Sequence, residues 1–105
     1  MVRVVITGQG TINALGSDVA STVDAMERGQ SGISLMDFPN VDRLNVKIGG
    51  QIKDFDPKVY FDRQKITFYD RFTQFALIAT KEAILQSGLV FEGELSQYSG
   101  VIFGT

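Results

Sequence analysis

The side chains that most often perform catalysis are missing from this sequence. It contains no cysteine and no histidine, so the commonest nucleophile, the commonest general base and the usual zinc ligands are absent. Carboxylates, hydroxyls, lysines and tyrosines remain, but no cluster of them has a spacing typical of an active site. The 105 residues therefore predict no catalytic residue, no metal site and no cofactor within this stretch.

One segment has the composition of a ligand-binding loop. Gly8-Gln9-Gly10 follows an apolar run from Val2 to Ile6, as at the start of a dinucleotide-binding motif. That motif needs a third glycine at the position occupied by Asn13. The next helix is expected only near Asp18, too far along the chain for its N-terminus to hold a phosphate beside the turn. Nucleotide binding is disfavoured, and a strand-end turn with positive φ is the preferred interpretation.

Three strands are expected along the chain. Residues 2–10 and 98–105 are apolar, β-branched runs that lead into glycine, typical of buried core strands. Residues 45–53 alternate between apolar and polar side chains, as in a half-buried strand. Gly49-Gly50 in its middle predicts a bulge or a close backbone approach. Residues 30–45 are expected to be irregular.

Two main helices are expected between these strands. The first spans 18–28, where Ser17 and Asp18 are good N-caps and Gly29 suits the left-handed position after the helix. The second spans 68–87 and is apolar on both sides, which predicts burial on both sides. One of its faces carries Ala76, Ala79 and Ala83, small enough to lie close to a sheet, and the other includes Leu77 and Ile84.

The order of these elements indicates an α/β fold with a parallel strand pair joined by a right-handed crossover. Two or three strands are few for a parallel sheet that needs cover on both faces, so the chain is expected to be an unfinished unit. The net charge is −2 and the apolar fraction is 44%, as in an ordinary globular protein. No secretory signal, membrane span or nucleic-acid partner is predicted, and a cytoplasmic setting is expected.

Several short segments, in order, resemble those of a known family. The chain resembles the N-terminal part of the β-ketoacyl-acyl-carrier-protein synthases, most closely the elongating type. The similar segments span the whole chain: Val4–Gly10 with Leu15-Gly16, Arg28–Ile33, Gly49–Pro57, Asp62-Arg63, Asp70–Ala76, Ser87–Leu89 and Gly100–Thr105.

The resemblance implies a thiolase-like fold with layers α-β-α-β-α, of which this chain would be an incomplete N-terminal part. It implies a decarboxylative Claisen condensation of acyl and malonyl groups on acyl carrier protein, in fatty-acid or polyketide elongation. The cysteine and two histidines of that reaction lie further along the family's chains, so no catalytic residue is expected here. Homodimers are implied for the intact enzyme.

The resemblance also implies a docking role for two basic residues. Carrier proteins are acidic, and relatives have basic residues just before the long helix. Arg63 and Lys65 keep that character here, whereas Gln64, Thr67 and Phe68 replace Lys or Arg. Arg63 and Lys65 are the predicted carrier-protein contacts, against the alternative of a solvated charged turn. Asp70 is expected to act structurally, as an acid at a helix start.

Other functions stay open at this point. A non-catalytic synthase-like partner, of the chain-length-factor type, would share these residues, because the cysteine that distinguishes the two lies outside them. A stand-alone interaction module is a third possibility, disfavoured by exposed strand edges. The isolated chain is expected to be inactive and to oligomerise or dissolve poorly, because the face with Leu77 and Ile84 lacks cover.

Overall fold

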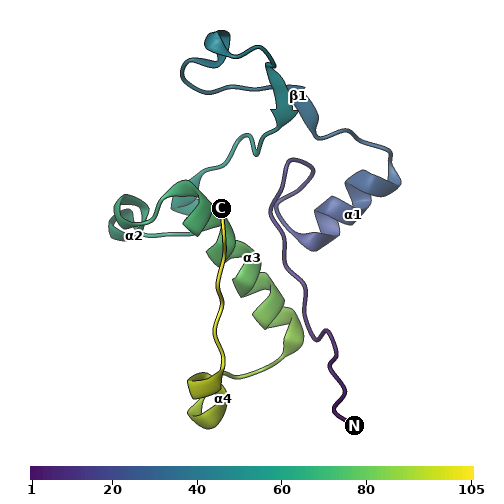
Figure 1. Cartoon of the computed structure of the whole chain (residues 1–105), viewed down its shortest axis with the longest axis vertical. Coiled ribbons are helices and arrows are strands. Elements are labelled where there is room, and N and C mark those ends of the chain that lie inside the picture. The colour runs from purple at the N-terminus through teal and green to yellow at the C-terminus, as the bar shows by residue number, and fades with distance from the viewer.

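The computed structural model describes residues 1–105 and has one long central helix. Figure 1 shows this helix, α3, with the extended N-terminal segment on one side and the C-terminal segment on the other. A short hairpin lies beyond one end of α3, and helices α1, α2 and α4 lie around α3. The elements in chain order are α1 (Val19–Glu27), β1 (Ile33–Leu35), η1 (Val41–Arg43), β2 (Ile48–Gly50), η2 (Pro57–Val59), α2 (Arg63–Phe68), α3 (Arg71–Ser87) and α4 (Gly93–Tyr98).

Helix α1 begins with a complete capping box. The Asp18 carboxylate accepts the Ser21 backbone N–H at 2.7 Å, and the Ser21 hydroxyl accepts the Asp18 N–H at 3.3 Å. These two bonds satisfy backbone donors that a helix start leaves free. The chain then leaves α1 through Gly29, whose φ of 66° is left-handed. Helix α1 thus lies within residues 18–28, where the sequence predicts a helix.

The expected helix over 68–87 corresponds to α3, which begins three residues later than expected, at Arg71. Phe68 ends α2, and Tyr69 is extended with φ −96° and ψ 128°. The Asp70 carboxylate then caps α3 by accepting the Thr73 hydroxyl at 2.6 Å and the Thr73 N–H at 3.4 Å. A side chain that caps a new helix competes with continuation of the previous one, which explains the break. Asp70 has the structural role expected of it, and Gly88 ends α3 with φ 68°.

The two strands form an antiparallel hairpin. Ile33 pairs with Gly50, Ser34 with Gly49 and Leu35 with Ile48. Strand β2 lies inside the expected range 45–53, but β1 falls where irregular structure was expected. Gly49 and Gly50 pair in regular register, so the expected bulge is absent. The parallel pair with its crossover is also absent, because the single sheet is this hairpin.

The structure differs from the core strands expected over 2–10 and 98–105. Residues 1–12 contain no strand or helix, and residues 99–105 are likewise extended without a paired neighbour. Tyr98, inside the expected strand 98–105, instead ends helix α4, which begins at Gly93. A strand exists only when a second strand accepts and donates its backbone hydrogen bonds. Neither segment has such a partner here.

The molecule is open, with little interior. Only Ala25 and Gln74 are buried among the 105 residues. The radius of gyration is 16.8 Å, compared with about 13 Å for a compact domain of this length. Apolar side chains such as Ile6 and Ile102 remain exposed. No helix has the length and apolar character that would let it cross a bilayer.

Candidate functional site

The two predicted carrier contacts, Arg63 and Lys65, both lie on the short helix α2. Asp62 caps this helix by accepting the Lys65 N–H at 2.9 Å. The Asp62 carboxylate also lies 3.7 Å from the Lys65 ammonium, and both side chains are more than half exposed. An ion pair this long and this exposed contributes little stability, so it leaves the Lys65 charge available to a partner.

Arg63 and Lys65 line different hollows of the surface. Arg63 lines a shallow hollow of about 470 Å³ with Gln64, Thr67 and Phe68. None of those three residues is charged, so Arg63 is the only positive charge in this hollow. Lys65 instead lines a groove of about 620 Å³ between α3 and residues 59–65, which also includes Asp18, Lys81 and Glu82. The predicted pair therefore does not form one patch.

An aromatic cluster packs the segment around Phe55 and Tyr60 against the start of α3. The Phe55 ring packs edge to face on Phe75, with centroids 4.9 Å apart, and stacks on Tyr60 at 5.7 Å. The Arg71 guanidinium lies 5.0 Å from the Phe55 centroid and 5.7 Å from that of Phe75. Such cation–π contacts stabilise the cation where it sits. Arg71 therefore joins residue 55 to α3.

Gln74 bridges the break between α2 and α3. It is buried, with 5% of its surface exposed, and its Nε2 donates to the Tyr69 carbonyl at 2.9 Å. That carbonyl belongs to the residue between the two helices, where an intrahelical partner is missing. The Gln74 Oε1 has no hydrogen-bond partner within the chain. A buried amide thus ties the first turns of α3 to the backbone of Tyr69.

The glycine turn lies directly on α3. A Cβ added to Gly8 would overlap the carbonyl oxygen of Ala83, and one added to Gly10 would overlap that of Ala79. Neither glycine has positive φ, so the expected left-handed turn is wrong. These glycines are required for close approach, because any side chain would push the segment off the helix. The small face of α3 lies close to an extended, unpaired segment and not to the sheet that was expected there.

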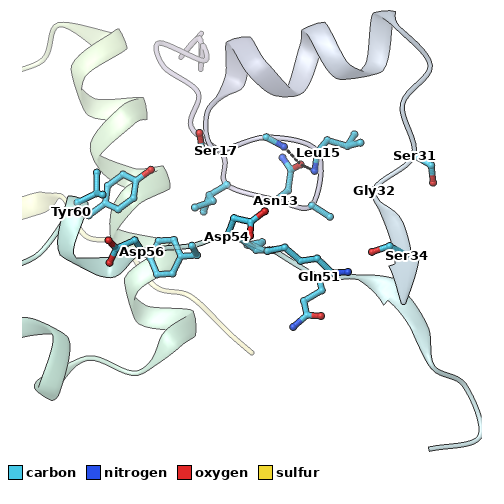
Figure 2. A pocket seen from close by; sticks show the side chains of 17 residues that line it. Asn13, Leu15, Ser17, Ser31, Gly32, Ser34, Gln51, Asp54, Asp56 and Tyr60 are labelled. Atoms are coloured by element: carbon cyan, nitrogen blue, oxygen red, sulfur yellow. Dashed lines mark hydrogen bonds between the residues drawn. The ribbon is translucent and has the colours of Figure 1, made fainter. Parts of the chain in front are cut away.

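In the loop after the glycine turn, backbone N–H groups donate to a side chain of the same loop. The Asn13 Oδ1 accepts the N–H of Leu15 at 2.8 Å and that of Gly16 at 3.3 Å. The Asn13 Nδ2 donates to the hydroxyls of Thr11 and Thr22, each at 3.0 Å. Figure 2 shows this side chain reaching across the loop to Leu15. Asn13 therefore organises the loop from within.

Glu82 of α3 is a residue that the sequence analysis missed. Its Oε2 accepts the Thr11 N–H at 2.9 Å, and its Oε1 accepts the Val19 N–H at 2.8 Å. The neighbouring Gln86 Oε1 accepts the Gln9 N–H at 2.6 Å. The only sequence signal is an acid and an amide four residues apart on the helix, which alone does not predict what they bind.

These contacts contradict a nucleotide site at the glycine turn. Phosphate binding in such loops needs free backbone N–H groups beside a helix N-terminus. Here the donors of Gln9, Thr11 and Leu15 already have acceptors within the chain. The Glu82 carboxylate lies among them and would repel a phosphate. The loop is part of the scaffold.

A second cleft lies beside this loop. It measures about 390 Å³ and is lined by residues of the Asn13 loop, the start of β1 and the segment 51–60. Figure 2 shows Asp54, Asp56 and Tyr60 along it. Its one ammonium group, on Lys53, donates to the Leu35 carbonyl at 2.6 Å. No group of three acidic side chains here could hold a metal ion, and no nucleophile lies beside a base.

One carboxylate near this loop has a shifted pKa. Hydrogen bonds from the Ser21 hydroxyl and then from the Ser21 backbone N–H lower the pKa of Asp18. Both donors stabilise the ionised carboxylate. The shift therefore reflects helix capping.

The sequence as a whole matches one protein family. Residues 1–105 match the model of the N-terminal domain of β-ketoacyl synthases. The chain belongs to the β-ketoacyl synthase family. The family predicted from the motifs is therefore confirmed. Membership of this family implies the thiolase-like α/β fold of that domain.

Two curated relatives illustrate the similarity. The 3-oxoacyl-(acyl-carrier-protein) synthase 2 of Staphylococcus aureus is 31% identical over 104 residues, covering 99% of this chain and 25% of the relative. The enzyme of the same name from Synechocystis is 32% identical over 103 residues, covering 98% and 25%. The chain spans about a quarter of the length of the curated relatives it matches.

Proposed function

We propose that this chain is the opening section of a β-ketoacyl-acyl-carrier-protein synthase. The proposed reaction joins an acyl group to a malonyl-derived unit on acyl carrier protein, with loss of carbon dioxide. The observation that carries the proposal is the family match along residues 1–105, together with relatives whose names state this activity. The ordered motifs from Val4 to Thr105 support the same conclusion.

The chain's own contribution is structural. No cysteine or histidine is present, so the acyl-accepting thiol and the imidazoles of the family reaction must come from other parts of the enzyme. The extended segment and loop of residues 8–19 are anchored on α3 by the close approach of Gly8 and Gly10 and by the Glu82 carboxylate. The proposed homodimer of the intact enzyme would also be formed by other parts.

A second proposed role is docking of the carrier protein at α2. Arg63 and Lys65 are both exposed on this helix, and Lys65 has only a weak ion-pair partner. Carrier proteins are acidic, and complementary charges guide and orient such encounters. This proposal concerns binding alone, so it can hold for a chain without catalytic residues.

The test of the proposed activity compares two proteins. We expect the purified 105-residue chain to form no 3-oxoacyl product from acyl- and malonyl-carrier protein, because it lacks the nucleophile. We expect the natural gene product to form that product and to contain the cysteine and two histidines. Turnover by the short chain, or a natural product that binds carrier without turnover, would contradict the synthase proposal. The second result would favour a non-catalytic partner subunit.

A further inference from the structure

Backbone groups along β1 and β2 face alternately toward and away from the neighbouring strand. The Met36 N–H donates to the Lys47 carbonyl at 2.8 Å, so these two residues form a hydrogen-bonded pair. Bonded and non-bonded pairs alternate along an antiparallel ladder, and Leu35 is opposite Ile48. The backbone N–H and C=O of Leu35 and of Ile48 therefore point away from the hairpin, at its two outer edges.

The outer edge of β1 is closed by side chains. The Leu35 carbonyl accepts the Lys53 ammonium at 2.6 Å. Asp37, two residues further along, donates its N–H to Gln51 Oε1 at 2.6 Å and accepts from Gln51 Nε2 at 2.7 Å. These side-chain groups occupy the positions that the backbone of a further strand would take, so this edge cannot pair again.

The outer edge of β2 is open. Its only neighbouring strand is β1, and no side chain bonds to the outward backbone groups of Ile48. Val46 is 65% exposed and Ile48 is 55% exposed, and Figure 1 shows the hairpin beyond one end of α3. An uncovered strand edge with β-branched side chains is a template on which another strand can pair.

We propose that the β2 edge pairs with the β2 edge of a second copy of this chain, antiparallel and centred on Ile48. This register sets the two copies of Ile48 opposite each other, and each Val46 opposite a Gly50 that leaves room for it. Lys47 then lies opposite Gly49. Centring on Lys47 would set two lysines face to face, and centring on Gly49 would leave each Ile48 opposite a glycine.

Pairing would join two hairpins into one four-stranded sheet. A two-stranded hairpin by itself is marginally stable in water, whereas three or more strands with an apolar face are more stable. Residues opposite each other share a face, so the face with Ile33, Leu35 and Ile48 would continue across the two-fold axis. The edge is three residues long, so we expect weak association. This contact is separate from the homodimer proposed for the intact enzyme.

Other occupants fit the β2 edge less well. The β-branched residues 2–6 of a second copy are extended and unpaired, but they would have to lose conformational freedom on binding. Strand β2 is already ordered by its pairing with β1. A partner chosen by charge is not favoured, because Lys47 is the only charged residue in segment 46–50.

The first test uses the absence of cysteine from the chain, because one introduced thiol then reports one contact. We expect Ile48→Cys to form an intermolecular disulfide in a glutathione buffer, since opposite residues of a hydrogen-bonded pair lie about 5.5 Å apart between Cα atoms. The matched control is Leu35→Cys, on the same face of the same hairpin. Its two copies would lie on the outermost strands, about 14 Å apart, and should stay unlinked.

The second test changes the charge at the centre of the contact. We expect Ile48→Lys to weaken self-association about tenfold in sedimentation equilibrium, because two ammonium groups would face each other. Leu35→Lys makes the same change at the opposite position of β1 and should stay within about twofold. An equimolar mixture of Ile48→Lys and Ile48→Glu should associate at least as tightly as the unaltered chain.

Hydrogen exchange shows whether the hairpin itself is intact. The Met36 amide, which bonds to Lys47 within the hairpin, should exchange equally in every variant and at every protein concentration. The Ile48 amide should become more protected as the concentration of the unaltered chain rises. If Ile48→Lys exposes the Met36 amide, Ile48→Thr replaces it, because it keeps the β-branched shape and should weaken association about threefold.

Three results would overturn the inference. The first is an equal disulfide yield for Ile48→Cys and Leu35→Cys. The second is a chain that stays monomeric while exchange at Ile48 ignores its concentration. The third is self-association that survives Ile48→Lys but is lost when residues 2–6 are deleted, which would assign the contact to that segment.

Discussion

Two parts of this molecule differ in whether their backbone N–H groups find hydrogen-bond acceptors. Between residues 8 and 19, main-chain donors bond to Gln86, Glu82 and Asn13 at distances of 2.6–3.3 Å. Residues 1–6 and 99–105 are more apolar, yet they form no helix, no strand and no backbone hydrogen bond to one another. The two regions adjoin, since residues 7–10, α3, Val101 and Phe103 line one hollow of about 580 Å³.

The difference shows what orders an extended segment in a molecule with almost no core. Apolar character alone leaves Val4 and Ile102 more than nine-tenths exposed. Specific acceptors and glycines that permit close approach anchor the neighbouring residues to α3. Four substitutions and one change of pH test this contrast, and they follow in order of expected effect.

Gly10→Val should have the largest effect. Its side chain would overlap the Ala79 carbonyl, and a helix backbone cannot move aside without losing its own hydrogen bonds. We expect the opening free energy of the Thr11 amide, measured by hydrogen exchange, to fall by about 3 kcal/mol or to vanish. Gly100→Val is the control, because nothing lies within 4 Å of its added Cβ. Equal effects in both would mean that the segment does not lie on α3.

Glu82→Ala should come next. It leaves the N–H groups of Thr11 and Val19 without acceptors. We expect a loss of about 2 kcal/mol in the opening free energy of both amides, since each loses a charged acceptor but gains access to water. Glu82→Gln should lose less, because it keeps one acceptor oxygen. Glu94→Ala on exposed α4 is the control, and an effect as large as that of Glu82→Ala would contradict the assigned role.

Asn13→Gly completes the glycine spacing of a dinucleotide-binding motif. It therefore tests whether the loop is part of the scaffold or a nucleotide site. We expect it to weaken protection of the Leu15 and Gly16 amides by about 1–2 kcal/mol, since both lose their acceptor. We expect no binding of a nicotinamide dinucleotide, because Glu82 still occupies the loop. Binding in a fluorescence titration would show that the nucleotide interpretation was rejected wrongly.

Acid should loosen the start of α1. The pKa of Asp18 is lowered in the folded chain by its bonds to Ser21, so its stabilising effect is present above the unfolded pKa of about 3.9 and is lost as the pH falls through the lower folded value. We expect the Ser21 amide to exchange faster across that window. Asp18→Asn should show a smaller pH dependence there, and an unchanged profile would contradict the capping role.

Val4→Thr should have the smallest effect. The side chain is 93% exposed, so the substitution removes no packing, and the change in opening free energy at α3 should stay within about 0.5 kcal/mol. Ile102→Ser, at the other end, should behave alike. A loss above about 1 kcal/mol in the 105-residue chain would mean that these segments are covered in solution, by self-association or by each other.

Much of the local structure was predictable because it depends on neighbours in sequence. Asp18 and Asp70 cap helices, and Gly29 and Gly88 follow them with left-handed φ. The family was predictable because the order and spacing of its motifs can be read directly from the sequence. The predicted start of this helix at residue 68 was wrong, because apolar periodicity continues through Tyr69 while the Asp70 cap makes Arg71 the first helical residue.

The candidate site was predictable only as a set of residues. Arg63 and Lys65 stand two positions apart, and the sequence predicts both as carrier contacts without placing their side chains relative to each other. On a helix two residues two positions apart point in different directions, so they line different hollows. Lys65 shares its groove with Lys81, sixteen positions away. No local sequence pattern predicts that these two residues line the same groove.

By itself, the sequence determined the family, the helix caps and the absence of a thiol or imidazole, because these depend on residue identity and short spacing. Only the tertiary structure decided that Gly8 and Gly10 serve close approach to α3 and that Glu82 holds the Thr11 and Val19 donors. It also decided that the β-branched runs at 2–10 and 99–105 are unpaired. The physical reason is that hydrogen-bond partners and close contacts are made between residues far apart in the chain, and local propensity carries no information about which of them meet.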